Sequence, residues 1–192
     1  MRTSAQERSE DSLSHNANLV RQAQTGDSAA FAQLYDAYVE RVYRYIYFRV
    51  SDVPTAEDLT SEVFLKAWQN LGRYQSADVP FLAWLYRIAR NQVIDFYRSQ
   101  KETTSLEDTV PVSVDVRALD AQVSNVFELQ ALRDSLQLLT EEQQQVLILR
   151  FIAGLPTRNI AQMLGKQEGA VRALQMRGLQ ALSKHMKEEE EP

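Results

Sequence analysis

The chain has 192 residues, of which 44% are hydrophobic, a formal net charge of −5 and no cysteine. This length allows one domain or two small ones, and the lack of cysteine excludes disulfide bonds and thiolate metal sites. No apolar run reaches the roughly 18 residues of a membrane-spanning helix, and the polar start of the chain lacks the apolar core of a signal peptide. We therefore expect a cytoplasmic protein without membrane insertion.

The acidic charge is concentrated in two segments. Residues 102–127 carry one base against five acids, and the terminal EEEEP adds four more acids. Residues 128–187 carry eight bases and five acids, which gives this part a net charge of +3. The charge of the whole chain therefore hides a basic C-terminal unit and says little about its partners.

Helical periodicity predicts four helices in the first unit. Residues 1–15 are polar and are expected to be disordered. The four helices are expected at about 16–25, 28–50, from Pro54 to about 71, and 81–101. Asp27 is a candidate N-cap, and Pro54 suits the first position of a helix because its missing N–H has no helical partner there.

The character of the chain changes after residue 101. Residues 102–123 are rich in Ser, Thr, Val and acids and are interpreted as an extended linker. Four more helices are expected at about 124–138, 141–153, 157–164 and 167–186, followed by an acidic tail at 188–192. The predicted fold class is all-α, with two small helical domains at 16–101 and 124–187.

The last two helices have the layout of a helix-turn-helix, in which the second helix enters the DNA major groove. Gly165 closes the first of them, as expected for a residue with positive φ. On a helical wheel, Val171, Leu174, Gly178 and Leu182 fall on one side of the second helix. The opposite side carries the candidate DNA-binding residues Gly169, Arg172, Ala173, Met176 and Arg177. An ordinary amphipathic helix with a solvated basic face is the alternative interpretation.

The fourth helix is basic and aromatic. The wheel places Phe81, Leu85, Ile88 and Phe96 on a buried side, with Arg87, Arg90 and Arg98 opposite and Asn91 and Tyr97 beside them. Such a stripe suits a nucleic-acid backbone and an exposed base. The alternative is a solvated charged face on which Asp95 pairs with Arg98.

Two stretches in series resemble a known family. "PTAEDLTSEVFLKAWQNL" followed by "FLAWLYRIARNQVIDFYR" resembles region 2 of the extracytoplasmic-function (ECF) group of the bacterial sigma-70 family. "LTEEQQQVLILRFIAGLPTRNIAQMLGKQEGAVRALQMRGLQAL" resembles region 4 of the same family. The resemblance implies a promoter-specificity subunit that binds core RNA polymerase, recognises the −10 and −35 elements and helps to melt DNA.

The resemblance also implies roles for individual residues. Asp58, Glu62 and Lys66 would dock on the β′ coiled coil of the polymerase, whose β subunit is a further expected partner. The −10 element would contact Tyr74, Gln75, Ser76, Arg87, Arg90, Asn91 and Arg98, with Tyr74 and Asn91 forming a pocket for a flipped base. The last helix would bind the −35 element, and an anti-sigma factor is a further family expectation.

Some residues depart from the family pattern. Pro156 and Asn159 stand where the family often has serine and glutamate, so the usual capping box is missing and Thr157 is the alternative cap. Gly178 is expected to weaken the last helix by up to about 1 kcal/mol relative to alanine.

Three other functional classes, an enzyme, a repressor and an interaction module, are alternatives to a sigma factor. No catalytic cluster, metal site or cofactor is expected, because the two histidines, His15 and His185, lie near opposite ends of the chain. The remaining alternatives are a one-component repressor that reads a palindromic site with its helix-turn-helix, and an interaction module that binds polymerase without reading DNA.

Overall fold

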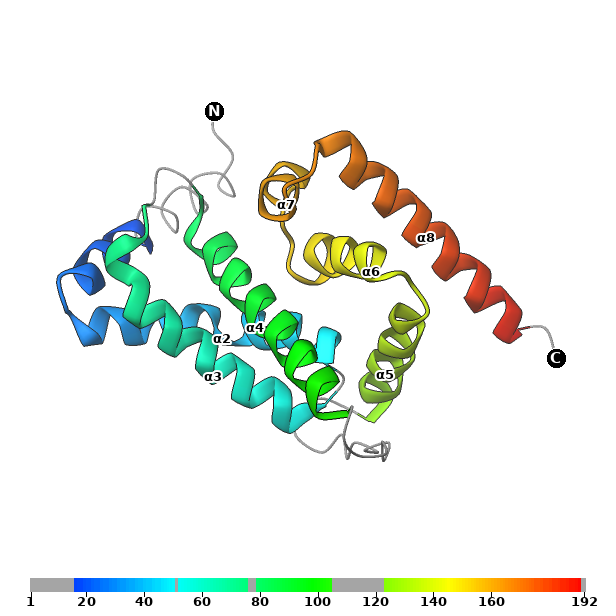
Figure 1. Ribbon diagram of the computed structural model, residues 1–192, viewed down its shortest axis with the longest axis horizontal. Helices are drawn as coiled ribbons and strands as arrows, with labels where there is room; N and C mark the ends of the chain where they lie inside the picture. The colour runs from blue at the N-terminus through cyan, green and yellow to red at the C-terminus, as the bar shows by residue number, and fades with distance from the viewer. Residues whose placement is uncertain (1–15, 51, 76–78, 105–122, 191–192) are drawn as a thin grey trace.

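The computed structural model describes residues 16–50, 52–75, 79–104 and 123–190, and these residues form helices and no strand (Figure 1). After a helix over 16–24, the elements are α2 (Ser28–Val50), α3 (Val53–Asn70), η1 (Leu71–Arg73), α4 (Phe81–Thr104), α5 (Val123–Gln137), α6 (Glu141–Leu147), η2 (Ile148–Ile152), α7 (Thr157–Leu164) and α8 (Glu168–Glu190). The predicted all-α fold class is confirmed. The predicted disordered residues 1–15 and most of the predicted linker lie outside the described residues, whereas α8 extends into the predicted acidic tail.

Side-chain caps explain where several helices begin. The Asp27 carboxylate accepts hydrogen bonds from the backbone N–H groups of Ala29, at 2.9 Å, and Ala30, at 3.1 Å, as predicted. Asp52 caps α3 by accepting from the N–H of Thr55 at 2.8 Å, so α3 begins just before Pro54. The predicted capping box before α6 is confirmed, because the Thr140 side chain accepts from the N–H of residue 143 while the side chain of that residue accepts in return.

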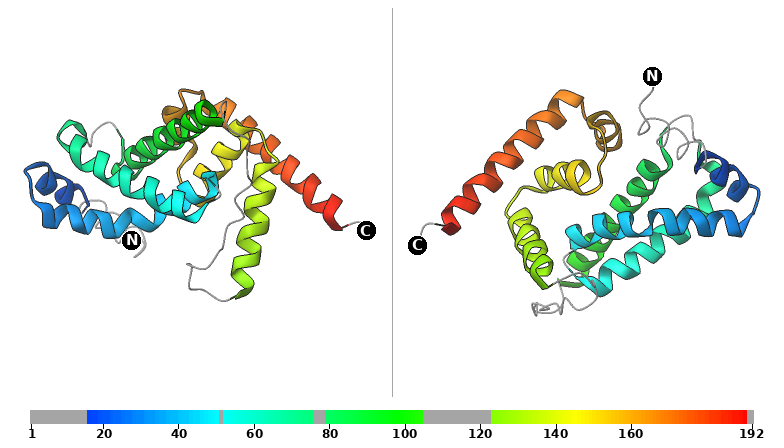
Figure 2. Two further views of the ribbon diagram at one scale, coloured as in Figure 1. Left: turned by 60° about the horizontal axis from the view of Figure 1, so that its bottom comes forward. Right: turned by 180° about the vertical axis from the view of Figure 1, so that it is seen from behind.

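Helices α2, α3 and α4 pack together into the first domain, and α5 to α8 form the second (Figures 1 and 2). Apolar side chains at helical spacing fill the first core, among them Leu34, Val42, Val63 and Leu85, each 0% exposed. Burial of such side chains is the main force that holds short helices together. The amphipathic pattern of each helix therefore accounts for the fold of each domain.

The two domains also pack against each other, which the prediction of tethered units did not anticipate. Helix α2 contacts η2, α4 contacts α7, and the buried apolar residues of both domains form one continuous cluster. Helix α4 is consequently buried on a wider arc than the wheel predicted. Tyr86 and Val93 are at most 1% exposed, although neither lies on the predicted buried side.

The helix predicted over 141–153 changes character before its end. Helix α6 stops at Leu147 and widens into the π-helical turn η2, in which the N–H of Ala153 donates to the carbonyl of Ile148 at 2.9 Å. Such turns carry one extra residue per hydrogen bond and often occur at functional sites. Here the turn ends at Ala153, whose carbonyl faces the first domain.

Candidate nucleic-acid interface

Helices α7 and α8 form the predicted helix-turn-helix. Gly165 ends α7 with a φ of 63°, a left-handed conformation that glycine adopts without steric cost. Ile160 and Ala161 of α7 and Val171 and Leu174 of α8 are all buried between the two helices and the rest of the second domain. The turn and the packing therefore fix the direction in which α8 projects.

The start of α7 differs from one expectation. Pro156 occupies the N-cap and makes no side-chain capping bond, and Thr157 is the first helical residue, so it does not act as the cap. Proline lacks an N–H and a polar side chain, and helix α7 therefore begins without the reciprocal bonds that stabilise α6.

The candidate DNA-binding face of α8 is open to solvent. The exposed residues include all five predicted ones, namely Gly169, Arg172, Ala173, Met176 and Arg177. Arg172 donates to the Glu168 carboxylate one helical turn earlier, at 2.8 Å. Because both side chains are exposed, this ion pair contributes little to the stability of the protein. Breaking it so that Arg172 can bind a phosphate would therefore cost little free energy.

The basic stripe of α4 is divided between solvent and the second domain. Arg87, Asn91 and Arg98 are exposed, and Arg98 lies 3.8 Å from the Asp95 carboxylate, the pairing named in the alternative interpretation. Arg90 is half-buried, and its Nε atom is buried without a hydrogen-bond partner. An unsatisfied guanidinium N–H is costly in a static interior, which marks Arg90 as a group that gains from a new polar partner.

The candidate −10 residues of the loop before α4 differ in their exposure to solvent. Gln75 is exposed and Ser76 lies outside the described residues. Tyr74 is only 6% exposed, its ring lies 5.4 Å from that of Phe81 and 5.0 Å from that of Trp84, and its hydroxyl donates to the Val79 carbonyl at 2.7 Å. Burial raises the pKa of Tyr74 to about 12. In this arrangement Tyr74 is bonded within the loop, whereas the Asn91 side chain is open to solvent.

The candidate polymerase-docking residues lie along α3 and are exposed. The buried Gln92 of α4 bonds to both Glu62 and Lys66, accepting from the lysine and donating to the carboxylate, while Asp58 points to solvent. Gln92 therefore fixes two of the three predicted side chains, a role that no local sequence pattern signals.

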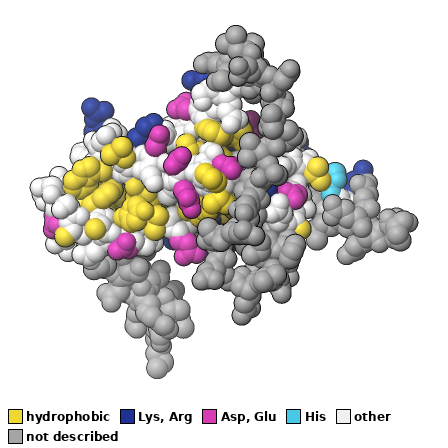
Figure 3. All heavy atoms as spheres, turned by 90° about the horizontal axis from the view of Figure 1, so that it is seen from below, with side chains coloured by type: hydrophobic (Ala, Val, Ile, Leu, Met, Phe, Trp, Pro, Cys, Tyr) yellow, Lys and Arg dark blue, Asp and Glu magenta, His cyan; other side chains and the backbone are white. Residues whose placement is uncertain are grey.

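Beside these charges the first domain exposes large apolar side chains. Leu65 and Trp68 of α3 are 56% and 37% exposed, and Tyr35 of α2 is 39% exposed. A groove of about 300 Å³ between the two helices is lined by Tyr35, Val39, Glu40, Tyr43, Glu57, Thr60 and Ser61. Figure 3 shows this mixture on the first domain, where hydrophobic side chains gather with Asp and Glu side chains among them. An exposed apolar patch with a charged rim is typical of a protein-docking surface.

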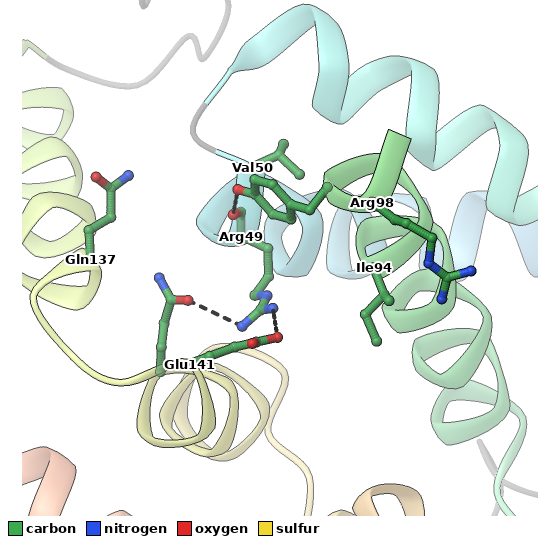
Figure 4. Close-up of a pocket in the computed structure, with 8 residues that line it drawn as sticks. Arg49, Val50, Ile94, Arg98, Gln137 and Glu141 are labelled. Carbon is green, nitrogen blue, oxygen red and sulfur yellow. Dashed lines mark hydrogen bonds and ion pairs between the residues drawn. The ribbon is translucent and has the colours of Figure 1, made fainter. Parts of the chain in front are cut away.

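A polar site between the domains escaped the sequence analysis. A cavity of about 730 Å³ is lined by Arg49, Val50, Ile94, Tyr97, Arg98, Gln137, Glu141 and Gln144, which come from α2, α4, α5 and α6 (Figure 4). Arg49 is only 6% exposed although it is charged, and it donates to Gln144 at 3.1 Å and to Glu141 at 3.4 Å. The only available signal was an arginine in an otherwise apolar helix end, "YIYFRV", which does not name its partners.

The described ranges carry neither a metal-binding cluster nor a membrane-spanning helix. No group of three or more His, Asp or Glu side chains there is arranged to hold a metal ion. No helix in the part of the chain that the structure describes is long and apolar enough to span a membrane.

Two family descriptions match the chain in series. Residues 34–103 match Sigma-70 region 2 and residues 129–182 match Sigma-70, region 4. The first match begins within α2 and extends through α3 and nearly all of α4, with all the candidate −10 and polymerase-docking residues, and the second covers α7 and most of α8. The order of the two matches agrees with the resemblance found in the sequence.

Characterised relatives point the same way. The chain is 41% identical over 170 residues to the ECF RNA polymerase sigma factor BldN of Streptomyces coelicolor, which covers 86% of this chain and 64% of BldN. It is 30% identical over 181 residues to the ECF RNA polymerase sigma factor SigW of Bacillus subtilis, which covers 88% of this chain and 95% of SigW. The chain thus spans less than two thirds of BldN but nearly all of SigW.

Two solved structures share the fold. CnrH, in complex with the cytosolic domain of CnrY, superposes with a TM-score of 0.71 at 24% identity, covering 90% of this chain and 97% of that chain. The sigma factor RpoE from Bartonella quintana, in complex with the anti-sigma factor NepR, gives a TM-score of 0.71 at 22% identity, covering 82% of this chain and 96% of that chain.

Proposed function

The chain belongs to the ECF group of the sigma-70 family, and on that premise we propose that it is a promoter-specificity subunit of bacterial RNA polymerase. It binds core enzyme, recognises the −35 and −10 elements and helps to melt the DNA for transcription initiation. The observation that carries this proposal is the order of the two matched regions. Each region also exposes basic and small or polar side chains that suit DNA, on α4 in the first and on α8 in the second. The protein is a non-catalytic initiation factor that acts in the cytoplasm, at the polymerase and its promoters.

The proposed −35 contact uses α8. Gly169 and Ala173 are small and exposed, so the helix backbone can approach the floor of the major groove, while Arg172 and Arg177 reach phosphates or guanine edges. Met176, at 63% exposed, offers an apolar contact to a thymine methyl group. The alternative of a solvated basic face does not need small residues at these positions.

The proposed −10 contact uses α4 and the loop before it. Extruding a base costs a few kcal/mol of stacking and pairing, which a preformed pocket offsets. Asn91 provides amide groups that can hydrogen-bond a base edge, and Arg87 and Arg98 neutralise the strand backbone. In this proposal Tyr74 and Gln75 contribute to the pocket, and Ser76, which lies outside the described residues, is a further proposed contact.

Polymerase docking is assigned to α3. Asp58, Glu62 and Lys66 form a charged row, and Leu65 and Trp68 expose apolar surface on the same helix. The β′ coiled coil and the β subunit are the proposed partners in core enzyme. Since CnrH and RpoE are solved with protein partners, we also propose that an anti-sigma factor binds this chain.

Run-off transcription with purified core polymerase on a promoter library tests the proposal. New sequence-specific start sites that require both the chain and core enzyme are the expected result. Specific binding to a palindromic duplex without core would instead identify a one-component repressor. Binding to core without any change in start sites would identify an interaction module.

Asn91→Ala tests the proposed base pocket. We expect loss of promoter melting, measured by permanganate reactivity of unpaired thymines, with unchanged binding to core enzyme. Asn18→Ala is the matched control, because it removes the same exposed side chain from the helix over 16–24, which carries none of the proposed DNA-binding or polymerase-docking residues. Normal melting by the Asn91 variant would contradict the pocket.

A further inference from the structure

The helix over 16–24 ends in a tightly bonded turn. Its apolar side chains lie in the core of the first domain, namely Leu19, Val20 and Ala23. The N–H of Gly26 donates to the Ala23 carbonyl at 3.0 Å, and the N–H of Asp27 donates to the Gln22 carbonyl at 3.2 Å. Gly26 has a φ of 95°, as expected for the glycine that closes such a helix end. The last turn of this helix therefore has a fixed position on the first domain.

Gln24 lies in that last turn and bonds to the loop before α4. Its Nε2 atom donates to the Leu71 carbonyl at 3.0 Å and to the Tyr74 carbonyl at 2.8 Å. An amide nitrogen carries two hydrogens, so these bonds use both donors of the side chain. The partners are 47 and 50 residues away in the sequence, so no local pattern indicates the contact. The N–H of Tyr74 also donates to the Leu71 carbonyl, at 3.0 Å, which closes η1 into one hydrogen-bonded unit.

The bond to the Tyr74 carbonyl orients the peptide group between Tyr74 and Gln75. Because a peptide group is planar, holding its oxygen also sets the direction in which the chain continues to Gln75. Gln75 is exposed and is one of the proposed −10 contacts. The Tyr74 hydroxyl donates to the carbonyl of Val79, on the far side of the loop, at 2.7 Å. Both sides of the loop are therefore bonded to Tyr74, and Gln24 holds the backbone of that residue.

We propose that Gln24 is a positioning residue for recognition of the −10 element, because it sets the backbone from which Tyr74 and Gln75 meet the melted strand. Gln24 acts through the loop and does not itself touch DNA. This proposal rests on the proposed function, because the loop reads a base only if the chain acts as a sigma factor. Without the two bonds, part of the binding free energy of the correct base would be consumed in ordering the loop. The preference for that base would then be weaker.

Three substitutions separate hydrogen bonding from charge and shape. Gln24→Glu keeps the size of the side chain but removes both donors, so that a carboxylate faces two carbonyl oxygens. Gln24→Lys keeps a donor of similar reach. Gln22→Glu is the matched control, because it makes the same change of charge at another exposed position of the same helix. Since Gln24 is also exposed, all three variants should keep the helical circular dichroism of the native chain.

Fluorine NMR of the free chain tests the contact. The sequence has two tryptophans, so a chain labelled with fluorotryptophan gives two signals, which Trp68→Phe assigns. The Trp84 ring lies 5.0 Å from the Tyr74 ring and therefore reports on the position of Tyr74. Gln24→Glu should shift or broaden the Trp84 signal and leave that of Trp68 in place, whereas Gln22→Glu should change neither. An unchanged Trp84 signal in Gln24→Glu would refute the contact.

Transcription by holoenzyme on a promoter library with a randomised −10 element tests the positioning role. In Gln24→Glu the preference for the best base at the most selective −10 position should fall about tenfold, the effect of losing two ordinary hydrogen bonds. The preference at the −35 element should not change. Binding of the phosphate backbone carries no sequence information, so a change of charge alone would lower transcription from all promoters alike. Gln24→Lys should keep most of the preference.

Each outcome decides for or against the role of Gln24. An equal −10 preference in Gln24→Glu and Gln22→Glu would overturn it, and so would an equal loss of preference in Gln24→Lys and Gln24→Glu. If the native chain with core enzyme gave no new start sites, the proposed function would fail and the positioning role with it. Fluorine NMR is measured without polymerase, so it still reports whether Gln24 holds the loop.

Discussion

Gly178 stands on the buried side of α8, where glycine weakens a helix, and the structure supplies a reason for it. A Cβ atom at this position would lie 3.0 Å from Leu147 Cδ1, 3.2 Å from Leu147 Cγ and 3.4 Å from Gln143 Cβ. Glycine therefore allows α8 to cross α6 closely. We predict that Gly178→Ala destabilises the protein or leaves its stability unchanged, although alanine is the better helix former.

The magnitude follows from two opposing terms. Alanine gains about 1 kcal/mol of helix propensity, and forcing a methyl group against a packed leucine costs about 1–3 kcal/mol, so the net change is a loss of about 0–2 kcal/mol. Gly169→Ala in the same helix is the control, because nothing lies within 4 Å of its added Cβ. That substitution should stabilise by up to about 1 kcal/mol.

Urea unfolding followed by circular dichroism measures both variants. The two alanine substitutions should differ by about 1–3 kcal/mol in free energy of unfolding, the estimated cost of the close contact. In a Leu147→Ala background the contact is gone, and Gly178→Ala should then become stabilising. Equal stabilisation by the two glycine substitutions in the native background would refute the close crossing.

Three further outcomes are expected. Arg172→Gln should weaken binding of holoenzyme to its promoter and reduce the slope of log affinity against log salt by about 0.9, as measured by anisotropy titrations, if this arginine contacts one phosphate. Leu65→Asp should weaken co-elution with core polymerase on size exclusion without changing the unfolding midpoint, because Leu65 is 56% exposed; unchanged co-elution would remove it from the docking surface. Burial raises the pKa of Tyr86 to about 12. The unfolded chain loses this proton near pH 10, so the free energy of unfolding should fall as the pH rises from about 10 to 12. Tyr86→Phe should make the fall of the urea midpoint with pH less steep, and an equally steep fall would exclude Tyr86 as its source.

The parts of the fold that depend on neighbouring residues were predictable from the sequence. Asp27, the Thr140–Gln143 box and Gly165 act within one turn of the chain, so their residue types alone indicate their roles. The wheel of α8 was equally reliable, because Val171 and Leu174 pack on adjacent elements of the same domain. Local pattern and tertiary packing agree at these positions.

The parts that depend on distant segments were not predictable. Tyr86 lies outside the predicted buried stripe of α4 and is nevertheless 0% exposed, because Tyr45 of α2 and Ala153 of the second domain both contact it. The packing of the Tyr74 ring against Phe81 and Trp84 of the following helix is likewise a contact that no local pattern indicates. A helical wheel shows which faces are apolar, and it does not show which polar groups a second domain can satisfy.

The wheel of α4 and the structure together give a physical reason for the mixed character of this helix. Exposed arginines such as Arg87 contribute nothing to the packing of α4, and a face used only for DNA would not need Tyr86, whose hydroxyl lies 3.5 Å from the Ala153 carbonyl of the second domain. Arg90 combines both demands: its Nε atom is buried without a partner while the domains are together. Burying that group has a cost, which apolar packing and the Arg49 contacts must offset. A phosphate of the proposed −10 strand would give the Arg90 guanidinium the partner that the packed domains leave its Nε atom without.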